Sequence, residues 1–135
     1  MRKRSLLLLF FLTTVTISGC KSDYDTRDLF VAVYNLNETW TENNVPMSKP
    51  VFSIPIYKSS TTANGILINN FGNYGIGITA AGTVNGTILT IPQQTLPNSK
   101  IISGSGALTG TTLVFTYTEI YSNISTSITA TGKML

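Results

Sequence analysis

The chain has 135 residues, of which 42% are hydrophobic and only 11% are charged, and its formal net charge is +3. Arg2, Lys3 and Arg4 account for this whole surplus, so the chain after them is neutral and has no basic footprint for nucleic acid. Histidine is absent, which excludes Ser-His-Asp and Cys-His catalysis and nearly every type of zinc site.

The first 20 residues have the pattern of an exported lipoprotein. The three basic residues precede an apolar segment, residues 6–12, which is too short to span a bilayer and is typical of a signal peptide. It leads to Ile17-Ser18-Gly19-Cys20, and Cys20 is the only cysteine. This segment resembles a bacterial lipobox, in which the chain is cleaved between Gly19 and Cys20 and fatty chains such as palmitate are attached to the thiol.

We therefore expect a signal peptide, in a helix, at residues 1–19 and a membrane anchor on Cys20. An ordinary secretory signal or an uncleaved anchor is the alternative. The small residues Ser18 and Gly19 favour the lipobox, and so does the lack of a second cysteine to pair with in an oxidising compartment. Two or three acyl chains hold a protein firmly, because each buried methylene contributes about 0.8 kcal/mol.

Residues 20–28 are polar and acidic, which predicts a tether between the lipid and a folded domain at residues 29–135. The spacing of Asp23, Asp25 and Asp28 is compatible with calcium ligands. The segment lacks the glycine and the closing glutamate of an EF-hand loop, so a solvated tether is favoured.

From Leu29 onward, apolar and polar residues alternate as in β-strands. In the first strand, Leu36 and Trp40 share one face, which Glu38 interrupts. The segment 41–50 contains two prolines and two adjacent asparagines and predicts a loop. Further strands are expected at 51–58, 66–71, 76–84, 87–91, 102–108, 112–118 and 124–134, with a longer connection at 92–98.

Asn85-Gly86 joins two of these strands and predicts a type I′ hairpin turn, because both residues tolerate positive φ. Pro55 cannot donate to a ladder and is expected at a sheet edge or a bulge. Gly104 and Gly106 predict a sharp bend or the close approach of another backbone. About eight short strands joined by short turns predict an all-β fold, an antiparallel meander that forms a small barrel or a sandwich.

Five short motifs occur along this predicted domain, namely Glu38-Thr39-Trp40, Asn70-Phe71, Asn85-Gly86, Ile91-Pro92-Gln93-Gln94 and Ile102-Ser103-Gly104-Ser105-Gly106. The series resembles small β-rich lipoproteins of Bacteroidetes. That resemblance implies a lipocalin-like fold and attachment to the outer membrane, facing either the periplasm or the cell surface. It implies no catalytic residue and no cofactor.

Large aromatic side chains form the first candidate site. They either line a cavity for an apolar ligand, as in a lipocalin-like barrel, or fill the core, and the core is favoured because so small a domain has few other large side chains. The residues are Tyr34, Trp40, Phe71, Tyr74, Phe115 and Tyr117.

Glu38 and Glu42, on either side of Trp40, form the second candidate site. A glycosidase needs two carboxylates at a fixed separation, but residues four apart on a strand lie about 13 Å apart, beyond both glycosidase geometries. Two solvated glutamates beside Trp40 are therefore favoured. We expect a non-enzymatic binding or structural module of the cell envelope whose partner is an unknown protein, glycan or apolar ligand. A carrier of apolar ligands and a carboxylate-dependent glycan hydrolase are the alternatives.

Overall fold

The computed structural model describes residues 24–135, so the predicted signal peptide, its cleavage site and Cys20 lie outside the described residues. The described part is an all-β protein with nine antiparallel strands and two short 3₁₀ helices, η1 (Thr26–Leu29) and η2 (Phe71–Asn73). The strands are β1 (Val33–Glu42), β2 (Val45–Ser48), β3 (Phe52–Lys58), β4 (Gly65–Asn69), β5 (Thr79–Asn85), β6 (Ile88–Thr95), β7 (Ile101–Thr109), β8 (Thr112–Tyr121) and β9 (Ile124–Met134).

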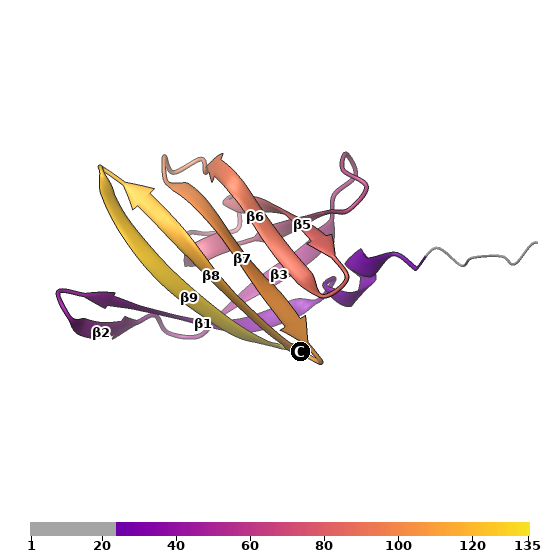
Figure 1. Ribbon diagram of the computed structural model, residues 1–135, viewed down its shortest axis with the longest axis horizontal. Helices are drawn as coiled ribbons and strands as arrows, with labels where there is room; N and C mark the ends of the chain where they lie inside the picture. Colours follow the sequence, from indigo (N-terminus) through magenta and orange to yellow (C-terminus); the bar gives the residue numbers. More distant parts are fainter. Residues whose placement is uncertain (1–23) are drawn as a thin grey trace, which may run out of the picture.

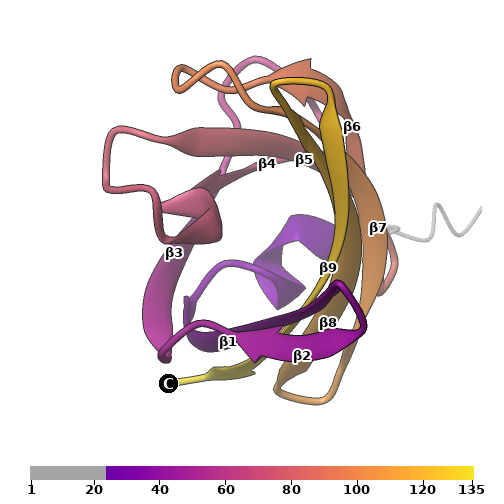
Figure 2. The same ribbon diagram turned by 90° about the vertical axis from the view of Figure 1, so that its left-hand side faces the viewer.

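The strands form a barrel and not a sandwich. Strands β3 to β9 pair in chain order, and β1 pairs with both β3 and β9, so eight strands form a closed ring (Figures 1 and 2). The ninth strand, β2, pairs with the last four residues of β1 and extends one side of the ring. Closure gives every strand of the ring two neighbours, which protects most of the edge groups that an open sheet exposes.

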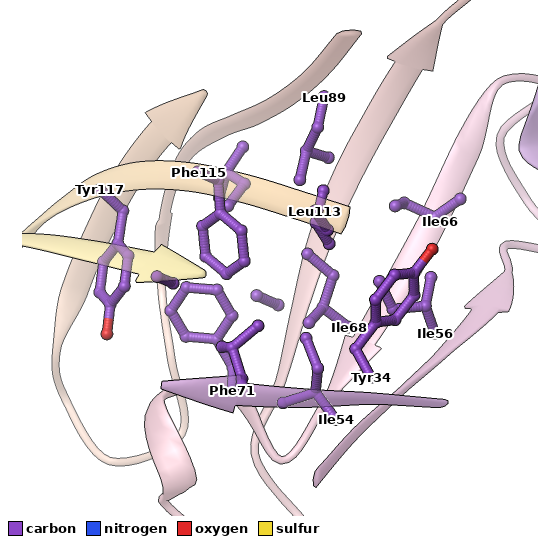
Figure 3. Packing of buried hydrophobic residues seen from close by; sticks show 14 of the residues in the cluster. Tyr34, Ile54, Ile56, Ile66, Ile68, Phe71, Leu89, Leu113, Phe115 and Tyr117 are labelled. Carbon is purple, nitrogen blue, oxygen red and sulfur yellow. The ribbon is translucent and has the colours of Figure 1, made fainter. Parts of the chain in front are cut away.

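Side chains fill the inside of the barrel (Figure 3). On β8, for example, Leu113, Phe115 and Tyr117 are buried, whereas Val114 and Thr116 between them are exposed. The space inside the ring in Figure 2 is therefore the hydrophobic core, and burial of its apolar surface stabilises the fold by about 25 cal/mol per Å². Its labelled members in Figure 3 are Tyr34, Ile54, Ile56, Ile66, Ile68, Phe71, Leu89, Leu113, Phe115 and Tyr117.

Gly104 and Gly106 on β7 make room for two of these aromatic residues. They lie opposite Tyr117 and Phe115 of β8. A Cβ atom added at either glycine would collide with the Cβ and Cα atoms of the facing aromatic residue. The close backbone approach predicted at these glycines is confirmed, and it is what lets large rings of β8 turn inward.

The loop predicted at 41–50 is wrong for most of its length. β1 continues to Glu42, Asn43 and Asn44 turn the chain with positive φ values of 50° and 62°, and β2 returns along β1. All four residues of β2 are exposed, so the alternating burial that marks a strand in the sequence is missing there. The predicted connection at 92–98 is also too long, because β6 continues to Thr95 through a register shift.

The hairpin turn predicted at Asn85-Gly86 is present, but its type differs. Asn85 pairs with Ile88, so Gly86 and Thr87 are the central residues. Of these two, only Gly86 has a positive φ, 58°. Positive φ at the first central residue alone matches a type II′ turn and not the predicted type I′ turn.

Pro55 is accommodated inside the closed ring. It lies opposite Val33 of β1, and the next amide, that of Ile56, donates to the carbonyl of Ala32. The nitrogen of Pro55 therefore faces the other neighbour, β4, whose pairing with β3 starts only at Ile56. Its missing N–H costs no ladder bond at that position, so neither a sheet edge nor a bulge is needed.

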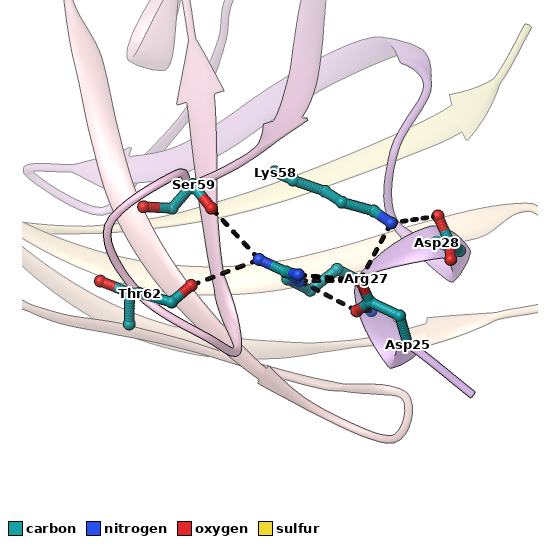
Figure 4. Close-up of polar contacts among 6 residues, drawn as sticks. All are labelled: Asp25, Arg27, Asp28, Lys58, Ser59 and Thr62. Atoms are coloured by element: carbon teal, nitrogen blue, oxygen red, sulfur yellow. Dashed lines mark hydrogen bonds and ion pairs between the residues drawn. The ribbon is translucent and has the colours of Figure 1, made fainter. Parts of the chain in front are cut away.

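The end of the barrel where the chain enters is covered by η1, which an ion-pair network fixes in place (Figure 4). The guanidinium of Arg27 bonds the carboxylate of Asp25 at 2.8 Å and two carbonyl groups of the β3–β4 loop. Lys58 lies 2.9 Å from Asp25 and 2.6 Å from Asp28. Residues 25–28, at the end of the predicted tether, are therefore held against the barrel.

The same network bears on the calcium hypothesis. The hydrogen bond from Arg27, and after it the one from Lys58, holds the pKa of the Asp25 carboxyl well below its usual range. Asp25 and Asp28 are the two candidate calcium ligands that the structure describes, and both are thus already paired with cationic side chains. Within residues 24–135, no three His, Cys, Asp or Glu side chains are grouped so that they could hold a metal ion. No helix of that part is long and apolar enough to cross a bilayer.

Candidate functional site

A groove lies at the end of the barrel opposite η1, where two hairpins diverge (Figure 1). β1 pairs with β9 as far as Thr39 and Thr129, and there the ladder stops. Both strands nevertheless continue: β1 runs on to Glu42 alongside β2, and β9 begins at Ile124 alongside β8. We call the space between the β1–β2 and β8–β9 hairpins the hairpin groove.

The hairpin groove has a volume of about 870 Å³ and a lining rich in hydroxyl groups. Trp40, Met47 and Ile124 give it apolar contact area, and Glu42 is the one charged residue among those that line it. The lining residues are Thr39, Trp40, Thr41, Glu42, Asn43, Pro46, Met47, Ser48, Ile124, Ser125, Thr126, Ser127 and Thr129. An aromatic ring among many hydroxyl groups suits a binding surface better than a reaction centre.

Glu38 precedes Trp40 by two residues on β1, has the same inward parity, and is completely buried. Lys49 Nζ donates to its Oε2 atom at 2.8 Å, and the Tyr117 hydroxyl donates to its Oε1 atom at 2.9 Å. The same ammonium donates to the carbonyl of Gly72 at 2.8 Å, which ties η2 to β1. A buried charge costs several kcal/mol unless it is paired, and here each oxygen of the carboxylate has its own donor.

Lys49 faces inward because it continues the register of β2 and lies opposite the inward-facing Glu38, just before a bulge between β2 and β3. Ser48 lies opposite Thr39 and Phe52 lies opposite Leu36, so three residues of one strand match two residues of β1. The extra residue reverses the alternation of side chains, so that Lys49 and, three positions later, Phe52 both face the interior. The amide of Lys49 also donates to the carbonyl of Glu38 at 2.9 Å, so main chain and side chain hold the pair together.

A second carboxylate, that of Glu119 on β8, is bound in the same way at this end of the barrel. Glu119 is 8% exposed and accepts hydrogen bonds from the Tyr74 hydroxyl, just after η2, and from Lys100 Nζ, just before β7. The two lysines stand against aromatic rings. Lys49 Nζ lies 4.6 Å from the ring centroid of Tyr74, and Lys100 Nζ lies 4.7 Å from the same centroid.

Two further rings extend this arrangement across the end of the barrel. Lys49 Nζ lies 6.0 Å from the ring centroid of Trp40, and Lys100 Nζ lies 4.9 Å from that of Tyr121. Each ammonium thus has a carboxylate and two rings as neighbours, and a cation–π contact contributes about 0.5–2 kcal/mol. Because every charge in this network has a partner, the network supports the structure of the site.

The tyrosines of the network are held in their neutral form. Burial, followed by the charge of Glu38, raises the pKa of Tyr117 far above its usual value. Burial, followed by the hydrogen bond to Glu119, raises the pKa of Tyr74 in the same direction. Neither hydroxyl can act as a base near neutral pH, and both serve as donors to the carboxylates.

The residues predicted to line a ligand cavity divide into two groups. Tyr34, Phe71, Phe115 and Tyr117 are at most 1% exposed and belong to the core. The rings of Phe71 and Tyr117 meet edge to face, with their centroids 4.8 Å apart. Trp40 and Tyr74 are only partly buried; Trp40 lines the hairpin groove, and Tyr74 donates to Glu119. The structure therefore separates Trp40 from the aromatic residues with which the sequence grouped it.

The prediction that Glu38 and Glu42 are solvated together beside Trp40 is wrong for Glu38, which is buried and bonded to Lys49 and Tyr117. Glu42 is exposed at the end of β1 and lines the groove. The two carboxylates lie in different surroundings and do not face a common substrate position.

Sequence patterns missed Lys49, Lys100 and Glu119. One signal was present, because Glu119 has the same parity on its strand as the inward-facing Phe115 and Tyr117, and a charge at such a position needs a partner. The partners themselves carried no signal, since Lys49 and Lys100 lie between strands.

No protein-family model matches the chain, and a search of curated proteins also gives no match. The function must therefore be inferred from the groove, the network next to it and the N-terminal segment.

Proposed function

We propose that the chain is a lipid-anchored, non-enzymatic binding module of the bacterial outer membrane, of the Bacteroidetes type, and that it binds its partner in the hairpin groove. The observation that carries this proposal is the end of the β1–β9 ladder at Thr39 and Thr129, beside a barrel whose interior is filled. The ends of β1 and β9 stay extended without pairing with each other, and they leave an accessible concave space of about 870 Å³.

The direction of the groove fits a membrane anchor. Cys20 is four residues before Tyr24, and four residues reach at most about 15 Å, so a lipid on Cys20 would stay within that distance of Tyr24. β1 runs from η1 to the groove, and its ten residues span about 33 Å. Figure 1 shows η1 at the end of the barrel opposite the tips of the β1–β2 and β8–β9 hairpins, which line the groove, so the groove would point away from the bilayer.

The alternatives fit the geometry less well. A carrier of apolar ligands needs space inside the barrel, where core residues such as Phe71, Phe115 and Tyr117 pack against one another. A glycan hydrolase needs two carboxylates that converge, whereas the Glu38 carboxylate is taken up by Lys49 and Tyr117.

The lipid anchor is tested with Cys20→Ser. Cells fed with labelled palmitate should label the wild-type protein, whereas Cys20→Ser should remain unlabelled and keep the size of the precursor. Placing a cysteine nearby, as Ser22→Cys in the Cys20→Ser protein, should not restore the label, because the peptidase cleaves directly before the modified cysteine. Labelling of Cys20→Ser would contradict the lipobox assignment.

The binding site is tested by photo-crosslinking in intact cells. A photoreactive residue replaces Ser127 in the groove or, as a control, Thr90, which is exposed on β6. We expect a discrete adduct from position 127 and none from position 90, with mass spectrometry identifying the adduct as protein, glycan or lipid. No adduct at 127, or equal adducts at both positions, would contradict the proposal.

A further inference from the structure

We infer that the hairpin groove takes up one extended segment of a partner protein, which inserts as an additional strand between β1 and β9. This inference rests on the proposed function and specifies the chemistry of the partner. It follows from the direction of the main-chain groups on the two edges of the groove.

On the β1 side, the proline of β2 reveals which way the main chain faces. Thr41 lies opposite Pro46, which has no N–H group, so the two cannot form a hydrogen-bonded pair. In an antiparallel ladder, residues alternate between bonding one neighbour and bonding the other. The N–H and C=O of Thr41 therefore point away from β2 and toward the groove.

On the β9 side, the turn gives the same information. Ser122 and Asn123 have positive φ values of 48° and 64°, as in a type I′ turn, and they connect the paired residues Tyr121 and Ile124. The amide of Ile124 closes this turn by donating toward β8. By alternation, the N–H and C=O groups of Ser125 and Ser127 face the groove, opposite those of Thr41.

These groups repeat every second residue, a spacing of about 6.7 Å, which is the repeat of an extended polypeptide. If the β1–β9 ladder continued beyond Thr39 and Thr129, it would pair Thr41 with Ser127. The main-chain groups of these two residues therefore still face each other across the groove, but they are not paired. An inserted strand satisfies both edges at once, as in β-strand addition. An acyl chain has no donors or acceptors to match this row.

The side chains of the groove predict which segments fit. Trp40 and Ile124 have the inward parity of their strands, whereas Thr41, Ser125 and Ser127 have the outward parity. An inserted segment should therefore alternate, with apolar residues toward the two large side chains and polar residues toward the hydroxyl groups. Glu42 is the one charged residue of the lining, so charge complementarity favours a lysine or arginine at an inward position of the inserted segment.

The test uses the lipidated full-length protein in nanodiscs and the peptide acetyl-Thr-Val-Thr-Val-Ser-Lys-Thr-amide. Hydrogen–deuterium exchange should slow in the segments 39–44 and 123–129 when the peptide binds, and exchange in β5 and β6 should not change. The same peptide with proline in place of the second valine should give no protection, because it lacks a main-chain donor in the middle of the strand. Absence of protection with the first peptide would overturn the inference.

Two variants of the protein separate main-chain from side-chain recognition. Thr41→Pro removes a donor that faces the groove and breaks no bond to β2, so peptide affinity should fall about tenfold or more, as for the loss of one or more hydrogen bonds. Thr41→Val keeps the amide and the shape of the side chain, and its affinity should stay within about threefold of wild type. Ser127→Pro repeats the test on the other edge if Thr41→Pro does not fold.

The outcome also distinguishes this inference from the proposed function. If Thr41→Pro and Ser127→Pro fold and bind the peptide as well as wild type, no strand is added and the inference fails. If chitotriose protects the same segments and the proline variants do not weaken its effect, the groove is a glycan site; the inference then fails while the binding function stands. If position 127 gives no crosslink in cells, the proposed function itself fails.

Discussion

At the scale of single residues, the barrel buries two tyrosine hydroxyls in different ways. The Tyr34 hydroxyl is buried and has no hydrogen-bond partner within the described residues, whereas the Tyr117 hydroxyl donates to Glu38. Burial alone raises the pKa of Tyr34 to about 12. A hydroxyl without a partner loses its bonds to water on folding and gains nothing in return, so it destabilises the folded state.

Phenylalanine at these two positions should therefore have opposite effects. We expect Tyr34→Phe to raise the free energy of unfolding by about 1 kcal/mol, because it removes an unsatisfied polar group. Tyr117→Phe should lower it by about 2 kcal/mol, because the buried carboxylate of Glu38 loses a donor. Urea denaturation measures both values, and a loss of stability in Tyr34→Phe would show that its hydroxyl has a partner after all.

The ion pair of Glu38 allows a similar comparison with an exposed pair. Lys49→Met leaves a buried carboxylate without its cation and should lower the free energy of unfolding by about 3 kcal/mol. Lys58→Met removes the cation beside Asp25 and Asp28 at the surface and should change the denaturation midpoint little. Equal midpoints for the two variants would mean that the network below the groove is not needed for folding.

These partners could not be predicted from the sequence, although the burial of the apolar residues could. Alternation predicts that Tyr34, Phe115 and Tyr117 face the core, since it is a local property of each strand. The contacts of Glu38 with Lys49 and Tyr117 join residues 11 and 79 positions apart. They exist only once the barrel has closed and β2 has paired with β1 so that Lys49 lies opposite Glu38, and no local pattern encodes either event.

At the scale of elements, strands with one buried face were predicted and the strand with none was missed. β8 and most of β9 alternate between buried and exposed residues, and both strands lie close to the predicted ranges 112–118 and 124–134. β2 has no buried residue, and its hairpin depends on two asparagines that tolerate positive φ. Since β2 forms one wall of the hairpin groove, the groove could not be predicted either.

The β5–β6 turn provides a test at this scale. Gly86→Val should destabilise the protein by about 1 kcal/mol or more, because a β-branched residue resists the φ of 58° even though a Cβ atom there meets no other atom. Gly77→Val is the matched control, since Gly77 also has open space around it but has no positive φ. Equal melting temperatures of the two variants would show that the turn does not require the left-handed conformation.

At the scale of the whole molecule, closure depends on the pairing of the first and last strands of the ring. Each neighbouring pair from β3 to β9 follows from a short connection, but β1 and β9 lie at opposite ends of the described chain. The local sequence patterns therefore could not distinguish a barrel from a sandwich. Closure also brings Glu38 of β1 next to Tyr117 of β8, so the stability of the whole barrel depends on the ionisation of its core tyrosines.

The protein should lose stability at alkaline pH for this reason. The pKa values of Tyr34 and Tyr117 are raised above the ordinary 10.0 by burial, to about 12 for Tyr34. Below pH 10 these hydroxyls are neutral in both states and their contribution is constant. Above pH 10 the unfolded chain releases protons that the folded barrel retains, so the free energy of unfolding falls by up to about 1.4 kcal/mol per pH unit for each tyrosine.

Denaturation midpoints between pH 8 and pH 11 measure this fall, and one variant isolates a single tyrosine within it. Tyr117→Phe should reduce the loss between pH 10 and pH 11 by about 1 kcal/mol relative to wild type, because one proton fewer is released on unfolding. Tyr57→Phe, at an exposed position on β3, is the control and should leave the slope unchanged. All other ionisable groups are common to the three proteins, so only the differences between slopes count. If the slope in Tyr117→Phe equals that of wild type, Tyr117 ionises as readily in the barrel as in the unfolded chain. Neither burial nor the charge of Glu38 then raises the pKa of the Tyr117 hydroxyl.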